Sequence, residues 1–215
     1  ASLAQGEHPA NPLVKYQVEH WTGKVEKLID TPTGVIGHQV NSVSGKSEEN
    51  ARGSSSALTL RLLAEIDREF ASRQYELWNK HFVTTQFGLP AVREYQKGTV
   101  GFGDVDSGPV IFGIGFAATI VAIADLAIFN NWIAGHEQFT TIHAFGFSWN
   151  TKKEKKYLLG QVPMADAFIA WGRASSLKYV PRKYLYFGFP IFNNFTKYSL
   201  GISLLLGFAI WRLKK

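Results

Sequence analysis

The chain of 215 residues contains no cysteine. This absence excludes a disulfide-stabilised scaffold, a cysteine nucleophile, a thiolate zinc site and an iron–sulfur cluster. Charged residues are also scarce at 19%, below the ~25% typical of soluble domains, whereas aromatic residues reach 14%. A chain with little charge and much apolar surface is not globally disordered.

Methionine occurs once, at Met164, and the chain begins at Ala1. No charged segment followed by an apolar one, as in a signal peptide, stands at the N-terminus. We therefore expect that the chain has lost an initiator methionine or a leader, or that it is a fragment of a longer protein.

The positive charge is concentrated near the C-terminus. Residues 1–150 contain 11 Lys and Arg against 15 Asp and Glu, whereas residues 151–215 contain 12 against 2. Such asymmetry predicts an anionic partner, either nucleic acid or a membrane surface. The basic segment is also rich in aromatic residues and lacks the pattern of an RNA-binding module, which favours membrane lipid and no nucleic acid.

The C-terminal segment predicts a membrane helix. Residues 198–211 are uncharged, and Lys197 at their edge can extend its amine to the interface. Ser203 and Gly207 stand four residues apart, a spacing that lets helices approach closely in lipid. We expect Tyr198, Ser203, Gly207 and Trp211 to contact the membrane, although a buried C-terminal helix or an interfacial hairpin would also fit. For a second apolar segment, residues 108–129, a buried core helix is favoured over a span.

The rest of the chain predicts helices joined by long loops. Apolar spacing indicates helices over 13–29, 54–70, 71–83, 130–146 and 162–175, with one short extended piece over 35–40. No run of alternating strands is evident, so the expected fold class is all-α. The loop over 84–106 is long, and such loops inside compact domains are usually functional.

This loop holds the densest polar cluster. Asp104 and Asp106 precede the apolar helix, and Arg93, Glu94 and Tyr95 lie upstream. Acidic side chains near a helix N-terminus are typical of a cap, which is one interpretation. The other is a set of carboxylates at the mouth of a pocket that performs general acid–base chemistry.

Other motifs are incomplete. The Gly-x-Gly pairs at 101–103 and 113–115 do not complete a dinucleotide fingerprint, and a P-loop lysine is missing. No two histidines have the helical spacing of a zinc site. We expect no metal and no cofactor, although His38, near glycines in the extended piece, is a candidate for facing a pocket.

Several strings together resemble a family of bacterial, often membrane-associated proteins that is similar to the linalool dehydratase/isomerase-like α/α-toroid proteins. The strings are residues 51–56, 63–67, 88–95, 103–109 and 159–166. The resemblance implies a partial toroid of helix pairs around a central cavity. It implies that the cavity is lined by Arg52, Arg93, Glu94, Tyr95, Asp104 and Asp106. The dehydratase's chemistry is thought to involve cysteines, which this chain lacks, so its hydration chemistry is not transferred.

Two functions follow as expectations. The first is an accessory subunit that packs against a larger membrane protein complex, with an arm over 1–12, a toroid-like domain over 13–176 and a membrane-anchoring tail over 177–215. The second is a lyase or hydrolase with a carboxylate-lined cavity for a lipid-like or sugar-like substrate. Its catalytic residues would be Glu94, Asp104 and Asp106.

Overall fold

The computed structural model describes residues 16, 20–21, 23–25, 27–86, 88–105, 107–146, 148–181 and 194–213. The elements follow in the order β1 (Gln39–Val40), β2 (Ser47–Glu49), α3 (Gly53–Ile66), α4 (Arg68–Phe82), β3 (Val83–Gln86), β4 (Leu89–Val92), β5 (Val110–Ile111), β6 (Ile114–Gly115), α5 (Phe116–Ile128), α6 (Trp132–Phe145), β7 (Trp149–Asn150), β8 (Lys155–Lys156), a 3-10 turn (Leu158–Gly160), α7 (Pro163–Tyr179) and α9 (Asn194–Leu213).

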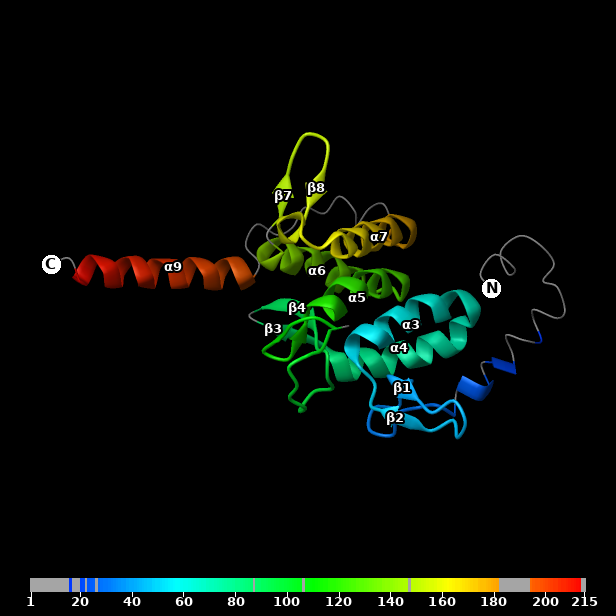
Figure 1. Ribbon diagram of the computed structural model, residues 1–215. Helices are drawn as coiled ribbons and strands as arrows, with labels where there is room; N and C mark the ends of the chain where they lie inside the picture. The colour runs from blue at the N-terminus through cyan, green and yellow to red at the C-terminus, as the bar shows by residue number, and fades with distance from the viewer. Residues whose placement is uncertain are drawn as a thin grey trace.

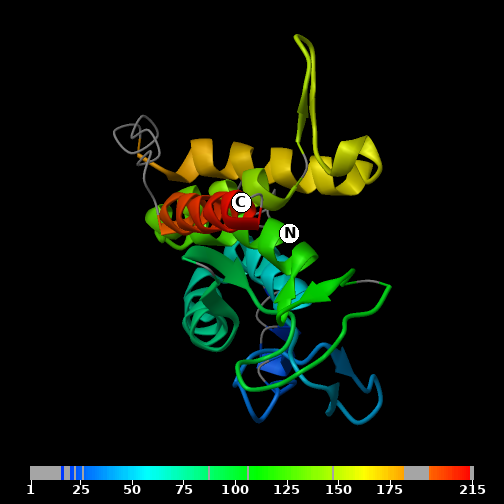
Figure 2. The same ribbon diagram turned by 90° about the vertical axis from the view of Figure 1, so that its left-hand side faces the viewer.

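Helix α5 lies at the centre of the core. All residues from Ala118 to Ile128 are buried, which agrees with a segment whose single ionisable residue is Asp125. Helices α3, α6 and α7 pack against it. Helices α6 and α7 lie on one side of α5, and α3 and α4 lie on the other, with β1–β2 beyond α4 and β7–β8 projecting from the opposite side (Figures 1 and 2).

Helices α3 and α4 are joined by a single residue, Asp67. Its backbone N–H donates to the Leu63 carbonyl at 2.8 Å, which ends α3, and its side chain accepts from the Phe70 backbone N–H at 2.9 Å, which caps α4. Trp78 of α4 is fully buried and donates its indole N–H to the Gly53 carbonyl at 3.3 Å. Helices α3 and α4 therefore pack together as a pair beside α5.

The expectation of an all-α, toroid-like fold is wrong, because the chain is a mixed α/β structure with several small antiparallel sheets. The clearest is the β3–β4 hairpin, in which Val83 faces Val92 and Gln86 faces Leu89. The β-branched residues of 83–85 favour strand over loop, and Gly88 at the turn has a φ of 78°, which suits glycine. Part of the predicted long loop is therefore ordered strand.

The predicted membrane helix is also corrected. Among the described residues, no helix is long and apolar enough to cross a bilayer. In α9 the uncharged stretch over 198–211 covers about 21 Å at 1.5 Å per residue, less than the ~30 Å hydrocarbon core. This finding overturns the predicted transmembrane helix and the membrane localisation that depended on it. Helix α5, the other candidate span, is the buried core helix.

Candidate functional site

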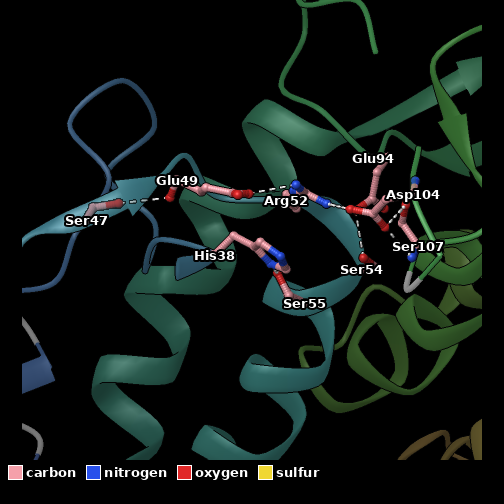
Figure 3. A network of polar contacts seen from close by, with 9 residues as sticks. All are labelled: His38, Ser47, Glu49, Arg52, Ser54, Ser55, Glu94, Asp104 and Ser107. Carbon is pink, nitrogen blue, oxygen red and sulfur yellow. Dashed lines mark hydrogen bonds and ion pairs between the residues drawn. The ribbon is translucent and has the colours of Figure 1, made fainter. Parts of the chain in front are cut away.

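The site begins at the N-terminus of α3, where Arg52 links two carboxylates. The Arg52 guanidinium donates to Glu49 Oε2 at 2.7 Å and, through its other terminal nitrogen, to Asp104 Oδ2 (Figure 3). Glu49 lies at the end of strand β2 and Asp104 in the loop before β5. Arg52 thus connects the β1–β2 hairpin to a loop that is distant in sequence.

Asp104 is held as an ionised carboxylate. Ser107 donates its backbone N–H and its hydroxyl to Asp104 Oδ1, both at 2.9 Å, and accepts from the Asp104 backbone N–H at 3.0 Å. These hydrogen bonds, together with the Arg52 guanidinium, hold the pKa of Asp104 well below its usual range. The side chain of Asp104 is 40% exposed, so it can meet a ligand.

Unlike Asp104, Glu94 has no exposed surface. Its Oε1 accepts from the Ser54 hydroxyl at 2.8 Å, whereas Oε2 is buried without a hydrogen-bond partner among the described residues. Burial raises the pKa of Glu94, and the Ser54 hydrogen bonds and the Arg52 charge offset part of the rise. The pKa of Glu94 is therefore raised, whereas that of its neighbour Asp104 is lowered.

The backbone fixes the position of Glu94. Its carbonyl accepts from the Gly53 N–H at 2.8 Å, and its N–H donates to the Gly113 carbonyl at 3.2 Å. A methyl group at Gly115 would lie 2.8 Å from Oε2, so glycine is needed for this close approach. Helix α3 and the β5–β6 hairpin enclose the acid from two sides.

A polar hollow of about 320 Å³ lies next to Arg52. It is lined by residues 48–52, Tyr95, Gln96 and Thr99. The Arg52 guanidinium stands over the Tyr95 ring at 5.7 Å from its centre, which orients both side chains. Arg52 therefore lines the hollow at one side while it binds Asp104.

The predicted site residues separate into two groups. Arg52, Glu94 and Asp104 come together, and Tyr95 lines the hollow with Arg52. Arg93 instead donates to the carbonyl groups of Tyr95 at 3.3 Å and Thr99 at 3.0 Å.

The remaining predicted residues lie elsewhere. His38 shares a hydrogen bond of 2.9 Å with the Ser55 hydroxyl, and Asp106 lies outside the described residues. Tyr198, Ser203, Gly207 and Trp211 belong to α9, where Trp211 is exposed.

Sequence reasoning did not assign Glu49, Ser54 and Ser107 to the site. Ser54 lies in the first turn of α3, and Ser107 precedes the apolar segment over 108–129, so the sequence indicates capping serines at both positions and not hydrogen bonds to the two carboxyl groups. Within the described part of the chain, no group of three or more His, Asp or Glu side chains is placed to hold a metal ion.

Comparison with known proteins does not assign the site to a family. No family model, curated protein or solved structure matches the chain. The resemblance to the α/α-toroid proteins therefore stays a prediction.

Proposed function

We propose that this chain carries a general acid–base site for hydrolysis or elimination on a sugar-like, hydroxyl-rich substrate. The observation that carries the proposal is the pair of carboxyl groups whose environments move their pKa values in opposite directions, upward at Glu94 and downward at Asp104. Two neighbouring acids with separated pKa values provide a proton donor and a proton acceptor at the same pH.

The hollow favours a sugar-like over a lipid-like substrate. Its lining supplies carboxylates from Glu48 and Glu49, a guanidinium from Arg52 and amides from Asn50 and Gln96. These groups bind hydroxyl groups by hydrogen bonds. A lipid tail would form no hydrogen bond with these groups.

The two acids take different roles in the proposal. Glu94, whose pKa is raised by burial, gives its proton to the leaving oxygen of the substrate. Asp104, ionised and partly exposed, takes a proton from an attacking water in hydrolysis, or from carbon in elimination. Because Glu94 is enclosed, the β5–β6 hairpin over Val110–Gly115 has to move aside before substrate can reach it.

The test is an activity screen of the full chain against neutral and acidic polysaccharides. Release of new reducing ends measures cleavage, and ultraviolet absorbance of an unsaturated product separates elimination from hydrolysis. We expect the variants Glu94→Gln and Asp104→Asn to lower turnover by about 10²-fold or more. The matched control is Glu69→Gln, on an exposed face of α4. Unchanged turnover in both site variants would contradict the proposal.

A second function, a subunit of a protein assembly, is favoured by α9. Consecutive leucines at 204–206 are 59–71% exposed, and Phe208 and Ile210 are exposed as well. Monomeric proteins rarely leave such a continuous apolar surface uncovered. We propose that a partner protein covers this helix in a groove, as amphipathic and apolar helices are often bound.

Light scattering of the full chain with its co-purified partner tests this second function. Leu205→Lys is expected to abolish the complex, whereas Val105→Lys, at an equally apolar loop position that is 99% exposed, leaves it intact. If the native chain is monomeric in light scattering and remains monomeric with every co-expressed candidate partner, the subunit role is excluded.

A further inference from the structure

Helices α6 and α7 and the β7–β8 hairpin lie on the opposite side of the molecule from β1–β2 (Figure 1). A second cluster of polar side chains joins these three elements. His143 belongs to the last turn of α6, Lys155 to β8 and Arg173 to α7. The Lys155 Nζ lies 3.2 Å from His143 Nδ1, and the Arg173 Nη2 lies 3.1 Å from His143 Nε2. Two cationic groups therefore contact the two ring nitrogens of one imidazole.

The hydrogen-bond inventory of this cluster does not balance. A neutral imidazole offers one N–H and one acceptor nitrogen, whereas an ammonium and a guanidinium only donate. In one of the two contacts, therefore, the ring N–H of His143 meets a second donor. If His143 were protonated, both ring nitrogens would carry a hydrogen, and both contacts would join two donors. Arg173 Nη2 also donates to the Tyr157 hydroxyl oxygen at 3.4 Å, and the hydroxyl hydrogen is a further donor. The cluster has more donors than acceptors.

Carboxylates near the cluster are engaged elsewhere. Asp166 accepts from the Tyr157 backbone N–H at 2.7 Å, and Glu154 pairs with Lys156 at 3.0 Å. Within the described chain, neither Lys155 nor Arg173 forms an ion pair with an acid. Burial and the charges of Lys155 and Arg173 lower the pKa of His143, in agreement with an excess of positive charge around the ring.

Aromatic rings hold the cations in place. Arg173 stands over the Phe139 ring at 4.9 Å, and Lys155 stands over the Tyr157 ring at 5.3 Å. The Tyr157 side chain is buried and His143 is half-buried, whereas Lys155 and Arg173 are exposed. The donors are thus positioned before any ligand arrives, and the cluster is open to solvent.

We propose that His143, Lys155, Tyr157 and Arg173 form a binding site for a tetrahedral oxyanion, the phosphate or sulfate group of a small molecule. An oxyanion supplies the acceptors that the cluster lacks. The guanidinium of Arg173 can donate two parallel hydrogen bonds to it, and the ammonium of Lys155 adds a single charged donor. The site goes beyond the proposed acid–base function and does not depend on it. The exposed charges at Lys152 and Lys153 of the same hairpin add longer-range attraction.

Isothermal titration of the full chain with inorganic phosphate, inorganic sulfate and glycerol phosphate, at constant ionic strength, tests the proposal. Saturable binding of all three indicates a site for the oxyanion itself. Tighter binding of glycerol phosphate alone indicates that the natural ligand is a phosphate ester. Both results support the site, and absence of saturable binding would overturn it.

Variants separate the site from general attraction to a basic hairpin. Lys155→Gln and Arg173→Gln are expected to weaken binding about tenfold or more, because each removes a charge-assisted hydrogen bond. Lys152→Gln removes the same charge from the same hairpin and is expected to change binding less than about twofold. Equal losses in Lys152→Gln and Lys155→Gln would overturn the proposal.

The His143 ring gives an independent readout by NMR. Phosphate or sulfate between the cations is expected to raise the pKa of His143, because a bound anion favours the imidazolium. Arg173→Lys keeps the charge but loses the two parallel hydrogen bonds, so this variant is expected to bind more weakly while its fold, followed by circular dichroism, is unchanged. A His143 pKa that does not respond to saturating anion would contradict the assigned geometry.

Discussion

Asp125 in the buried helix α5 predicts an unusual dependence of stability on pH. The side chain has no exposed surface, and neither carboxyl oxygen has a hydrogen-bond partner among the described residues. Burial raises the pKa of Asp125 well above its usual value of 3.8, although the charge of Arg61 opposes the rise. Arg61 itself pairs with Glu65 at 2.6 Å and stands over the Trp171 ring at 5.2 Å. We therefore expect a neutral Asp125 in the native state.

The magnitude follows from proton linkage. Above pH 3.8 the unfolded chain releases the proton of Asp125, whereas the native chain keeps it up to its raised pKa. The unfolding free energy then falls by about 1.4 kcal/mol per pH unit within this window. Asn at this position is neutral at every pH and has almost the same shape. The difference in unfolding free energy, Asp125→Asn minus native, is therefore expected to grow by about 1.4 kcal/mol per pH unit.

Urea unfolding of both proteins between about pH 5 and about pH 8 measures this difference. Other titrating groups cancel in the subtraction, including Glu94 with its raised pKa and His136 and His143 with their lowered ones. Glu69→Gln, at an exposed carboxyl group, serves as the control and is expected to give a flat difference. A flat difference for Asp125→Asn as well would refute the reasoning and indicate an ionised Asp125 paired with Arg61.

Four further substitutions test the packing around the site. Glu94→Gln is expected to stay folded. Because the pKa of Glu94 is raised, the unfolding free energy of the native protein is expected to fall with pH above the usual glutamate pKa of 4.5, and the variant is expected to lose this dependence in urea unfolding. Gly53→Ala is expected to lower the melting temperature, because its methyl group would collide with the Arg93 carbonyl. Trp78→Ala removes a fully buried ring and is expected to cost about 3–5 kcal/mol in calorimetry. Asp67→Ala removes a helix cap and is expected to cost about 1 kcal/mol.

Helices were predictable from the sequence where apolar spacing is regular. The predicted helices over 54–70 and 71–83 correspond to α3 and α4, with their junction at Asp67 instead of near residue 70. The β3–β4 hairpin was missed because its strands are short and one contains Pro90, which lacks a donor. The membrane helix was a wrong prediction because Arg212 and the polar residues at 194–199 shorten the apolar stretch of α9.

The composition of the site was partly predictable, but its pairing was not. Glu94 and Asp104 were chosen for their chemistry, and Arg93 was expected beside Glu94, opposite Asp104 and Asp106. Successive side chains of extended backbone point to opposite sides, so the Arg93 guanidinium turns away from its neighbour toward Thr99. The cation that meets Asp104 is Arg52, which no local pattern could connect with it across the intervening helices and hairpin.

The one-residue junction at Asp67 fixes the rotational phase of α4. Since each helical residue turns the chain by about 100°, one inserted residue would swing the buried face of α4 by more than a quarter of a circle. Trp78 would then leave the Gly53 carbonyl, and the N-terminus of α3, which carries Arg52, would lose its packing partner. The length of the chain between these helices is therefore under tighter constraint than the identity of most residues within them.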